Sequence, residues 1–255
     1  GIRMWTDAAK VEAMKTLLQP LFQPIVDGDG RLYAYEALMR FAGEGPQSSP
    51  LTRIEYWEKT GYITVLDRAM IASVATAAKD SAARRRFAVN VSITTVENDG
   101  AAYLSDLQAL AVHADEIIVE LTETAPMQSV QEVIRFAAAC KADGHLVALD
   151  DCSPNHPYSS PNFLHKIQPQ LVKIDGSFLK ESFTSGDTAA LRSLVATARS
   201  IGACVIAEHI ENGALRDFAL DLGVSYLQGY GVGVPARLPH AEQLRATLGK
   251  AGQAL

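Results

Sequence analysis

The sequence predicts an α/β fold, a TIM-like (β/α)8 barrel whose first strand runs antiparallel to its neighbour. Short apolar runs alternate with helical patterns along most of the 255 residues. Such runs are typical of strands buried on both faces, and their alternation with helices favours a barrel. A hairpin near the start of the chain accounts for the antiparallel strand. A doubly wound open sheet is the competing architecture that this pattern leaves open.

The first part of the chain predicts a lead-in helix and a hairpin, and the rest predicts alternating helices and strands. Asp27-Gly-Asp-Gly30 joins the first two apolar runs, and this turn chemistry favours an antiparallel pair. Gly, Pro and Ser residues mark a loop at 43–50, and a second irregular loop covers Cys152–Tyr158. We divide the chain into a lead-in segment, 1–19, and a barrel domain, 20–255. From apolar spacing, the elements in order are helix 7–19, strands 21–26 and 31–40, helices 51–59 and 63–80, strand 87–91, helix 101–111, strand 117–121, helix 128–143, strand 146–150, strand 170–174, helix 187–201, strand 203–207, helix 212–222, strand 225–228 and helix 239–248.

The composition argues against several classes of protein. A formal net charge of -6 does not suit a protein that coats DNA or RNA. No apolar run approaches the roughly 18–20 residues that a membrane span needs, and the first residues lack the apolar segment of a signal peptide. Cys140, Cys152 and Cys204 are too scattered for a metal finger and fit a reducing compartment. We expect a cytoplasmic protein that does not bind DNA and has no membrane span in this chain.

Polar side chains follow most of the predicted strands near their C-terminal ends. In a barrel these ends converge on one mouth, where active sites lie. In strand order the residues are Glu36 and Arg40, Asn90, Glu120 and Glu123, Asp150 and Asp151, Lys173 and Asp175, Glu208 and Glu211, and Gln228.

Most of these residues are carboxylates, whereas only Arg40 and Lys173 are cations. Like charges about 4 Å apart repel by several kcal/mol even at an effective dielectric near 20. We therefore expect two divalent cations at the mouth. Carboxylate and amide oxygens favour Mg²⁺ or Mn²⁺ over zinc, and two such ions suit in-line displacement at phosphorus.

Several of these residues also have an ordinary structural explanation. Lys173 is the exception, because it lies inside an apolar run, where a buried ammonium needs an anion. His156 and His209 lie beside the predicted site, and lone histidines are more often packing or surface residues than metal ligands. The ordinary explanations are loop caps or surface charges for Glu123, Asp175 and Glu211, a satisfied turn for Asn90, a rim ion pair instead of a phosphate clamp for Arg40, and an unreactive filler for Cys152.

The motifs that contain these residues follow one another in a specific order. They are Phe22-Gln-Pro-Ile-Val26, Glu36-Ala-Leu-Met-Arg40, Asn90-Val-Ser92, Glu120-Leu-Thr-Glu123, Asp150-Asp151, Tyr158-Ser-Ser160, Lys173-Ile-Asp175, Ala207-Glu-His-Ile-Glu211 and Gln228-Gly-Tyr230. In residue type, order and spacing this set resembles the signature of the EAL domain family over about residues 20–240. The resemblance makes 20–255 an EAL-type barrel domain.

The resemblance implies a phosphodiesterase that opens the bacterial messenger cyclic di-GMP to linear pGpG with Mg²⁺ or Mn²⁺. By resemblance, the first metal ion would be held by Glu36, Asn90, Glu120 and Asp150, and the second by Asp150, Asp151 and Glu208. Lys173 would orient the attacking water, and Glu208 is also the candidate general base. Glu123 would anchor the loop after strand five. Gln23, Leu38 and Arg40 would seat guanine and phosphate. Gln228 would support the metal–water network and is grouped with these three as a substrate-binding residue.

Two positions depart from the family pattern. Residues 152–157, Cys-Ser-Pro-Asn-His-Pro, stand where the family usually has Phe-Gly-Thr-Gly. The loop is therefore longer and lacks the glycines that permit positive φ, so we expect it to take another path. In the family this loop links the metal site to the dimer interface. His209 stands where the family usually has glycine, and its ring would either crowd the metal ions or add a contact.

The sequence leaves two main functions open. The complete set of metal-ligand residue types favours a working cyclic di-GMP phosphodiesterase. The altered loop and His209 favour a receptor that binds the nucleotide without hydrolysing it, and a barrel that acts only through protein contacts is a third possibility. By family habit we expect a homodimer that is coupled to sensory or cyclase domains outside this chain.

Overall fold

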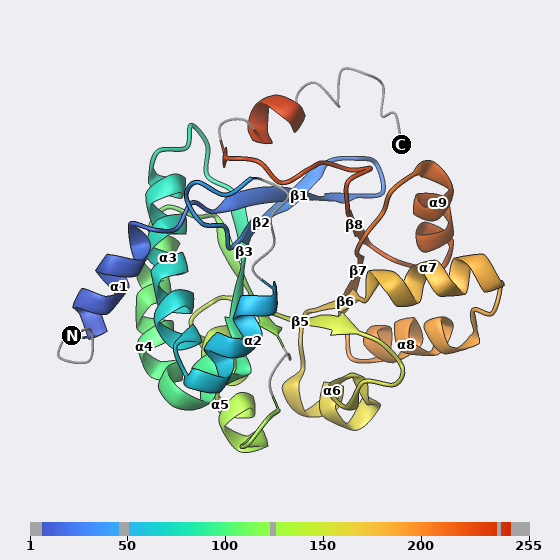
Figure 1. The fold of residues 1–255 in the computed structure, drawn as a ribbon. Helices are drawn as coiled ribbons and strands as arrows, with labels where there is room; N and C mark the ends of the chain where they lie inside the picture. The colour runs from blue at the N-terminus through green and yellow to red at the C-terminus, as the bar shows by residue number, and fades with distance from the viewer. Residues whose placement is uncertain (1–6, 46–50, 123–125, 239–240, 246–255) are drawn as a thin grey trace.

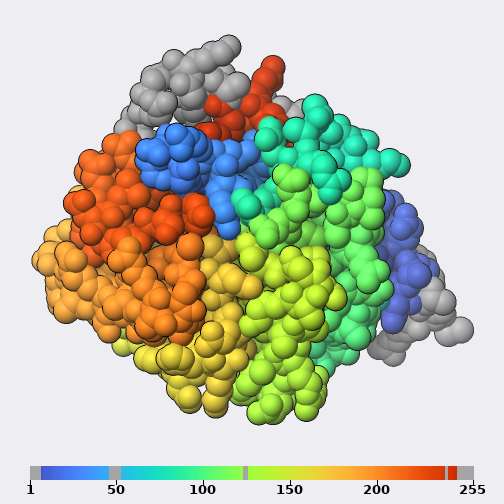
Figure 2. All heavy atoms as spheres, turned by 180° about the vertical axis from the view of Figure 1, so that it is seen from behind, coloured from blue at the N-terminus to red at the C-terminus, as the bar shows by residue number. Residues whose placement is uncertain are grey.

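A computed structural model describes residues 7–45, 51–122, 126–238 and 241–245 of the chain. Within these residues, eight strands close into one barrel in the order β1-β2-β3-β4-β5-β6-β7-β8, and helices surround it (Figure 1). Closure confirms the predicted TIM-like barrel and excludes the open sheet. Seen from behind, successive segments follow one another around the molecule, from green through yellow and orange to red (Figure 2).

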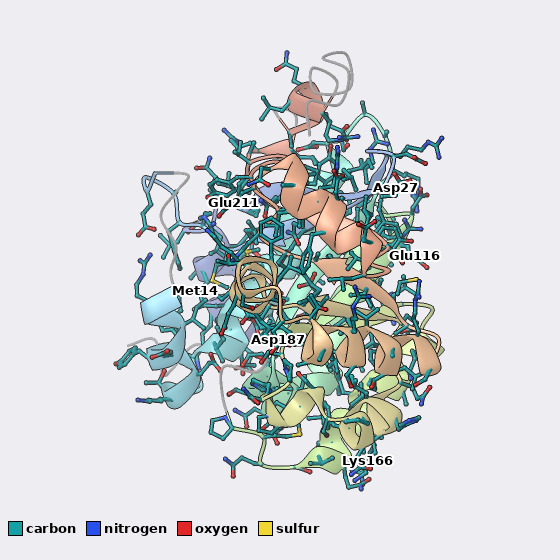
Figure 3. The ribbon with its side chains drawn as sticks, turned by 90° about the vertical axis from the view of Figure 1, so that its right-hand side faces the viewer. Met14, Asp27, Glu116, Lys166, Asp187 and Glu211 are labelled. Atoms are coloured by element: carbon teal, nitrogen blue, oxygen red, sulfur yellow. The ribbon has the colours of Figure 1, made fainter. Side chains whose placement is uncertain are left out.

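The strands lie where the sequence predicts them, with ends that differ by one or a few positions. β1 pairs antiparallel with both β2 and β8, and the other neighbouring pairs are parallel. The antiparallel first strand is therefore confirmed: its last residue, Asp27, lies on the same side as Glu116 at the start of β4 and away from Glu211 (Figure 3). The strands are β1 Leu21–Asp27, β2 Leu32–Leu38, β3 Arg86–Ser92, β4 Glu116–Thr122, β5 Leu146–Cys152, β6 Leu171–Ile174, β7 Cys204–Ala207 and β8 Tyr226–Gln228.

Helices connect the parallel strands and cover the barrel. Several begin at a residue whose side chain accepts a hydrogen bond from the first turn, as Ser92, Ser129 and Asn212 do. The helices are α1 Asp7–Lys15, α2 Leu51–Thr60, α3 Ile63–Lys79, α4 Ile93–Ala111, α5 Val130–Ala142, α6 Pro161–Ile167, α7 Gly176–Ser185, α8 Ala189–Ser200 and α9 Gly213–Asp221, with a 3-10 turn, η2, at Pro157–Ser159.

Two helices, α6 and α7, are absent from the elements predicted by apolar spacing. Hydrophobic periodicity is a weak signal over their 7 and 10 residues. Their caps were the available signal: the Ser160 hydroxyl accepts from Phe163 N–H, and Asp175 Oδ1 accepts from Ser177 N–H. The prediction for α4 also starts too late, because Ser92 caps a first segment that meets the second at Asp99, whose φ is -155°. Of the last predicted helix, residues 241–245 are helical, and the remainder lies outside the described residues.

The barrel interior contains a layer of apolar side chains, one from each of the first seven strands. A larger apolar cluster fills the space between the strands and the helices, and Cys152 is buried in it, as predicted for a filler. Because side chains alternate along a strand, residues two positions from each layer member also point into the barrel. The layer consists of Ile25, Ala34, Ala88, Ile118, Ala148, Leu171 and Ile206.

The lead-in helix α1 packs against α3 and has no buried residue of its own. The division of the chain between residues 19 and 20 stays a prediction. Among the described helices, none is both long enough and apolar enough to cross a membrane.

Candidate functional site

The predicted site residues lie one layer beyond the apolar layer, at the mouth formed by the C-terminal ends of the parallel strands. On β1, which runs the other way, Gln23 precedes Ile25 by the same two positions at which site residues follow the layer on other strands. Strand periodicity thus places side chains from the whole chain in one ring. The pairs are Ala34 and Glu36, Ala88 and Asn90, Ile118 and Glu120, Ala148 and Asp150, Leu171 and Lys173, Ile206 and Glu208, and Tyr226 and Gln228.

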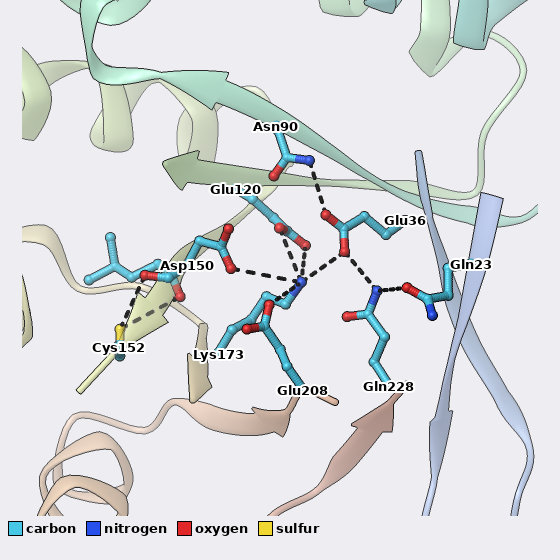
Figure 4. Close-up of polar contacts among 10 residues, drawn as sticks. Gln23, Glu36, Asn90, Glu120, Asp150, Cys152, Lys173, Glu208 and Gln228 are labelled. Carbon is cyan, nitrogen blue, oxygen red and sulfur yellow. Dashed lines mark hydrogen bonds and ion pairs between the residues drawn. The ribbon is translucent and has the colours of Figure 1, made fainter. Parts of the chain in front are cut away.

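Lys173 lies at the centre of this ring with 1% of its side chain exposed (Figure 4). Its ammonium donates to Glu36 Oε1 at 2.9 Å and to both carboxylate oxygens of Glu120 at 3.3 Å. It also forms ion pairs with Glu208 Oε1 at 3.1 Å and Asp150 Oδ1 at 3.9 Å. The predicted need of Lys173 for an anion is confirmed, and one positive charge faces four carboxylates.

A chain of side-chain amides fixes the orientation of Glu36. Asn90 Nδ2 donates to Glu36 Oε2 at 3.0 Å, and Gln228 Nε2 donates to Glu36 Oε1 at 2.7 Å. Gln228 Nε2 also lies 3.1 Å from Gln23 Oε1, and Gln23 Nε2 donates to the Gly233 carbonyl at 3.0 Å. The first and last strands therefore help to hold the Glu36 carboxylate beside Lys173.

An irregularity in β5 explains how two adjacent aspartates reach the same mouth. Consecutive residues of a regular strand point to opposite faces. Between the partners Leu149 and Cys152, however, β5 advances three residues while β6 advances two. Asp151 lies in this bulge with φ at 47°, a left-handed conformation that is uncommon for a non-glycine residue. Ligand oxygens of Asp150, Asp151 and Glu208 consequently lie within 4.8 Å of one another.

Burial dominates the acid–base behaviour of the ring. Burial raises the pKa of Glu120 well above its ordinary value, and the charge of Glu36 raises it further. Burial likewise raises the pKa of Glu208 well above normal, with help from Asp150, whose own pKa burial raises to about 6. At Glu36 burial acts in the same direction, but Lys173 and the surrounding amides outweigh it and lower the pKa.

The ring fits divalent cations with oxygen ligands. Asn90 Oδ1 and Asp150 Oδ1 are buried and accept no hydrogen bond within the described part of the chain. A buried polar oxygen without a hydrogen bond is costly even where, as at Asp150 Oδ1, an ammonium lies 3.9 Å away, and a hard cation would satisfy it. Carboxylates that retain protons because of burial and mutual repulsion would release them to such an ion.

Two cavities open at the mouth. One of about 580 Å³ is lined by all four residues predicted to bind substrate, Gln23, Leu38, Arg40 and Gln228. The other, of about 650 Å³, lies over the aspartate bulge and is lined by Asp150, Asp151 and His156 among others. Glu36, Leu38, Arg40 and His209 line both cavities.

The remaining predicted residues have varied positions. Asp175 caps α7, in agreement with its structural explanation, and Glu211 is exposed and pairs with Lys180 at 3.4 Å. His156 Nδ1 accepts from Tyr158 N–H inside the altered loop. Glu123 lies outside the described residues. Tyr230, which lines the 580 Å³ cavity, was not predicted as a site residue, although it belongs to one of the motifs.

Comparison with known proteins agrees with this geometry. The sequence model of the EAL domain family matches residues 10–235. The chain belongs to the EAL domain family.

Two relatives of the chain have names that describe cyclic di-GMP enzymes. The chain is 30% identical over 223 residues to the cyclic di-GMP phosphodiesterase PdeF of Escherichia coli, covering 85% of this chain and 30% of PdeF. It is 30% identical over 247 residues to MucR of Pseudomonas aeruginosa, a bifunctional diguanylate cyclase and cyclic di-GMP phosphodiesterase, covering 89% of this chain and 34% of MucR. The chain thus spans about a third of the length of these relatives.

A solved structure of the MucR phosphodiesterase in complex with cyclic di-GMP shares the fold. It superposes with a TM-score of 0.75 at 28% identity and covers 93% of this chain and 98% of the solved one. The likeness therefore extends over nearly all of the barrel.

Proposed function

We propose that this domain is a metal-dependent phosphodiesterase that hydrolyses cyclic di-GMP to linear pGpG. The observation that carries the proposal is the ring of carboxylates at the mouth, in which buried oxygens of Asn90 and Asp150 lack hydrogen-bond partners within the described residues. The ring lies beside two cavities of about 580 and 650 Å³, which offer space for a dinucleotide. Relatives that carry this activity in their names support the substrate class.

We assign the ligands of two ions, Mg²⁺ or Mn²⁺, to two halves of the ring. Glu36, Asn90, Glu120 and Asp150 would hold the first ion, whereas Asp150, Asp151 and Glu208 form the compact carboxylate cluster for the second. When bound, two such ions would polarise the phosphodiester and make water more acidic.

The protein's own residues would position the reactants. Lys173, once its carboxylate partners engage cations, has an ammonium free to orient water, and Glu208 lies 3.1 Å from it as a proton acceptor. Gln23, Leu38 and Arg40 would seat the nucleotide in the 580 Å³ cavity, while Gln228 orients Glu36. In the reaction, water oxygen joins phosphorus, the bond to the 3′ oxygen breaks, and that oxygen takes up the proton.

A receptor that binds cyclic di-GMP without turnover is the second candidate. Two observations favour it: Asp151 adopts a left-handed conformation, and the residues after it form a proline-containing turn instead of a glycine loop. We also propose, from the greater length of the relatives, that sensory or cyclase domains act with this one. The homodimer and the cytoplasmic location stay predictions from the sequence. The anchoring role of Glu123 stays a prediction.

The direct experiment is incubation of the purified domain with cyclic di-GMP and Mn²⁺, followed by chromatography for pGpG. The phosphodiesterase proposal expects linear product that disappears when EDTA is added. Binding by calorimetry without any product would favour the receptor, and neither binding nor product would exclude both.

A further inference from the structure

His209 occupies an unusual position at the mouth, directly after Glu208 and outside the regular part of β7. Its φ is 57°, which costs energy for any residue with a side chain. The residue is exposed and, among the hydrogen bonds described for this chain, its imidazole makes none. A strained residue without a hydrogen-bonding role in the fold suggests a role in binding.

The glycine that begins α7 leaves room for the imidazole of His209. A Cβ atom added to Gly176 would lie 2.3 Å from His209 Nδ1, 2.4 Å from Cγ and 2.6 Å from Cβ. The imidazole therefore lies directly on the backbone of α7, in space that only glycine at 176 leaves open.

Nε2 belongs to the edge of the imidazole opposite the Nδ1–Cγ edge that meets Gly176. His209 lines both the 580 Å³ and the 650 Å³ cavity, as do Glu36, Leu38 and Arg40. A ligand that extends over both cavities must pass between these residues. The part of a cyclic dinucleotide that crosses such a boundary is its sugar–phosphate ring, because the two bases project to either side.

We infer that His209 is a ligand-binding residue whose Nε2 hydrogen-bonds a phosphate or sugar oxygen of the dinucleotide, and that Gly176 is its positioning partner. The inference rests on the proposed function, since it presumes that a cyclic dinucleotide enters the mouth. It assigns the ring to substrate binding and not to the metal ions.

Calorimetry with cyclic di-GMP in EDTA measures affinity without turnover, and kinetics with Mn²⁺ separates KM from kcat. His209→Gly removes the ring and relieves the backbone, so Kd and KM should rise roughly five- to tenfold, the effect of one hydrogen bond, while kcat stays within twofold. The melting temperature should stay equal or rise, because the left-handed conformation suits glycine. His209→Asn, which also tolerates this conformation but has a shorter side chain, should bind as weakly as His209→Gly. His165→Ala on α6 removes another imidazole as a control and should change nothing.

Gly176→Ala tests the seat of the ring. In the natural background the added methyl group should displace the imidazole from this position and weaken binding at least fivefold. In the His209→Gly background the same substitution should have no effect, because no ring is displaced. Equal losses in both backgrounds, or a His209→Gly variant with unchanged Kd and KM, would overturn the inference. A His209→Gly variant with altered Mn²⁺ dependence alone would also overturn it. If the natural domain fails to bind cyclic di-GMP, the proposed function itself fails.

Discussion

The two ends of the barrel are built from the same strands in opposite ways. One end lies opposite the mouth, where the parallel strands begin, and we call it the closed end. There the rings of Tyr33 and Tyr226 stack with centroids 3.8 Å apart, and the Arg86 guanidinium lies 4.2 Å over Tyr33. Arg86 Nε also pairs with Glu116 at 2.7 Å, so its charge is matched. At the mouth, by contrast, several buried carboxylates share the ammonium of Lys173.

This difference indicates that the closed end stabilises the fold, whereas the mouth carries the functional site. Stacked rings and matched charges lower the free energy of the folded chain. Unmatched buried carboxylates raise it, and such a cost is typical of functional sites. Changes at the two ends should therefore differ in kind: the closed end affects stability, whereas the mouth affects metal binding and turnover.

The largest expected effect on stability comes from Lys173→Met. This change leaves the surrounding carboxylates without their cation, and loss of one partner from a buried charge cluster costs about 3–5 kcal/mol. Urea denaturation at pH 8 in EDTA should show the loss, and millimolar Mn²⁺ should narrow the gap to the natural chain. The matched control is Lys180→Met, which removes an exposed ion pair with Glu211. This change should alter the free energy of unfolding by less than about 0.5 kcal/mol. If Lys173→Met were as stable as the natural chain in EDTA, the carboxylates around Lys173 would not be under charge repulsion.

The next effect concerns turnover and compares one carboxylate at each end. Glu36→Gln keeps the shape but removes a proposed metal ligand. Loss of a ligand should exceed the roughly 10–100-fold that loss of an outer partner of a ligand costs, so kcat/KM should fall more than about 100-fold. Glu116→Gln at the closed end should leave kcat/KM within twofold. Similar kinetics for both variants would mean that the mouth is not the catalytic end.

A buried carboxylate near the mouth gives a pH-dependent prediction. Asp67 Oδ2 accepts from Ser92 N–H at 3.0 Å and the Thr95 hydroxyl at 2.6 Å, and burial raises its pKa to about 7. Because this pKa lies above the unfolded value near 4, the stabilising contribution of the proton is complete below about pH 4 and lost as pH rises through 7. As pH rises through that window, the free energy of unfolding of Asp67→Asn should therefore increase relative to that of the natural chain, by up to about 1.4 kcal/mol per pH unit. Denaturation curves at pH 5, 6 and 7 measure the difference, and a constant difference would contradict the assignment.

The smallest expected effect lies at the closed end. Arg86→Met removes the guanidinium from Tyr33 and from Glu116, a loss of about 1 kcal/mol for a partly exposed cation–π and ion pair. The thermal midpoint should fall while kcat/KM for cyclic di-GMP stays the same. A decrease in kcat/KM with unchanged stability would break the distinction between the two ends.

Much of the fold and site follows from local sequence. The strands and the residues at their ends were predictable because apolar runs mark buried strands, and Lys173 within such a run requires anions. The features that the sequence did not predict depend on long-range contacts or on backbone conformation. The amide of Gln228 meets both Glu36 and Gln23 only because β1 closes the barrel against β8. The bulge at Asp151 likewise depends on pairing between β5 and β6, which no pattern in one strand reveals.

The position of His209 on Gly176 illustrates the same limit. The two residues are far apart in sequence, and neither has a local pattern that predicts the other. The sequence marked His209 only as a departure from the family and left crowding and contact equally open. The structure favours contact, because the imidazole packs on the backbone of Gly176 and His209 lines both cavities.

Anomalous diffraction from crystals grown with Mn²⁺ and cyclic di-GMP tests most directly whether the mouth is a two-metal site. Two manganese peaks are expected, one among Glu36, Asn90, Glu120 and Asp150, and one among Asp150, Asp151 and Glu208, with nucleotide density over both cavities. Bound nucleotide without any manganese peak at these residues would contradict metal-dependent catalysis at the mouth of this barrel.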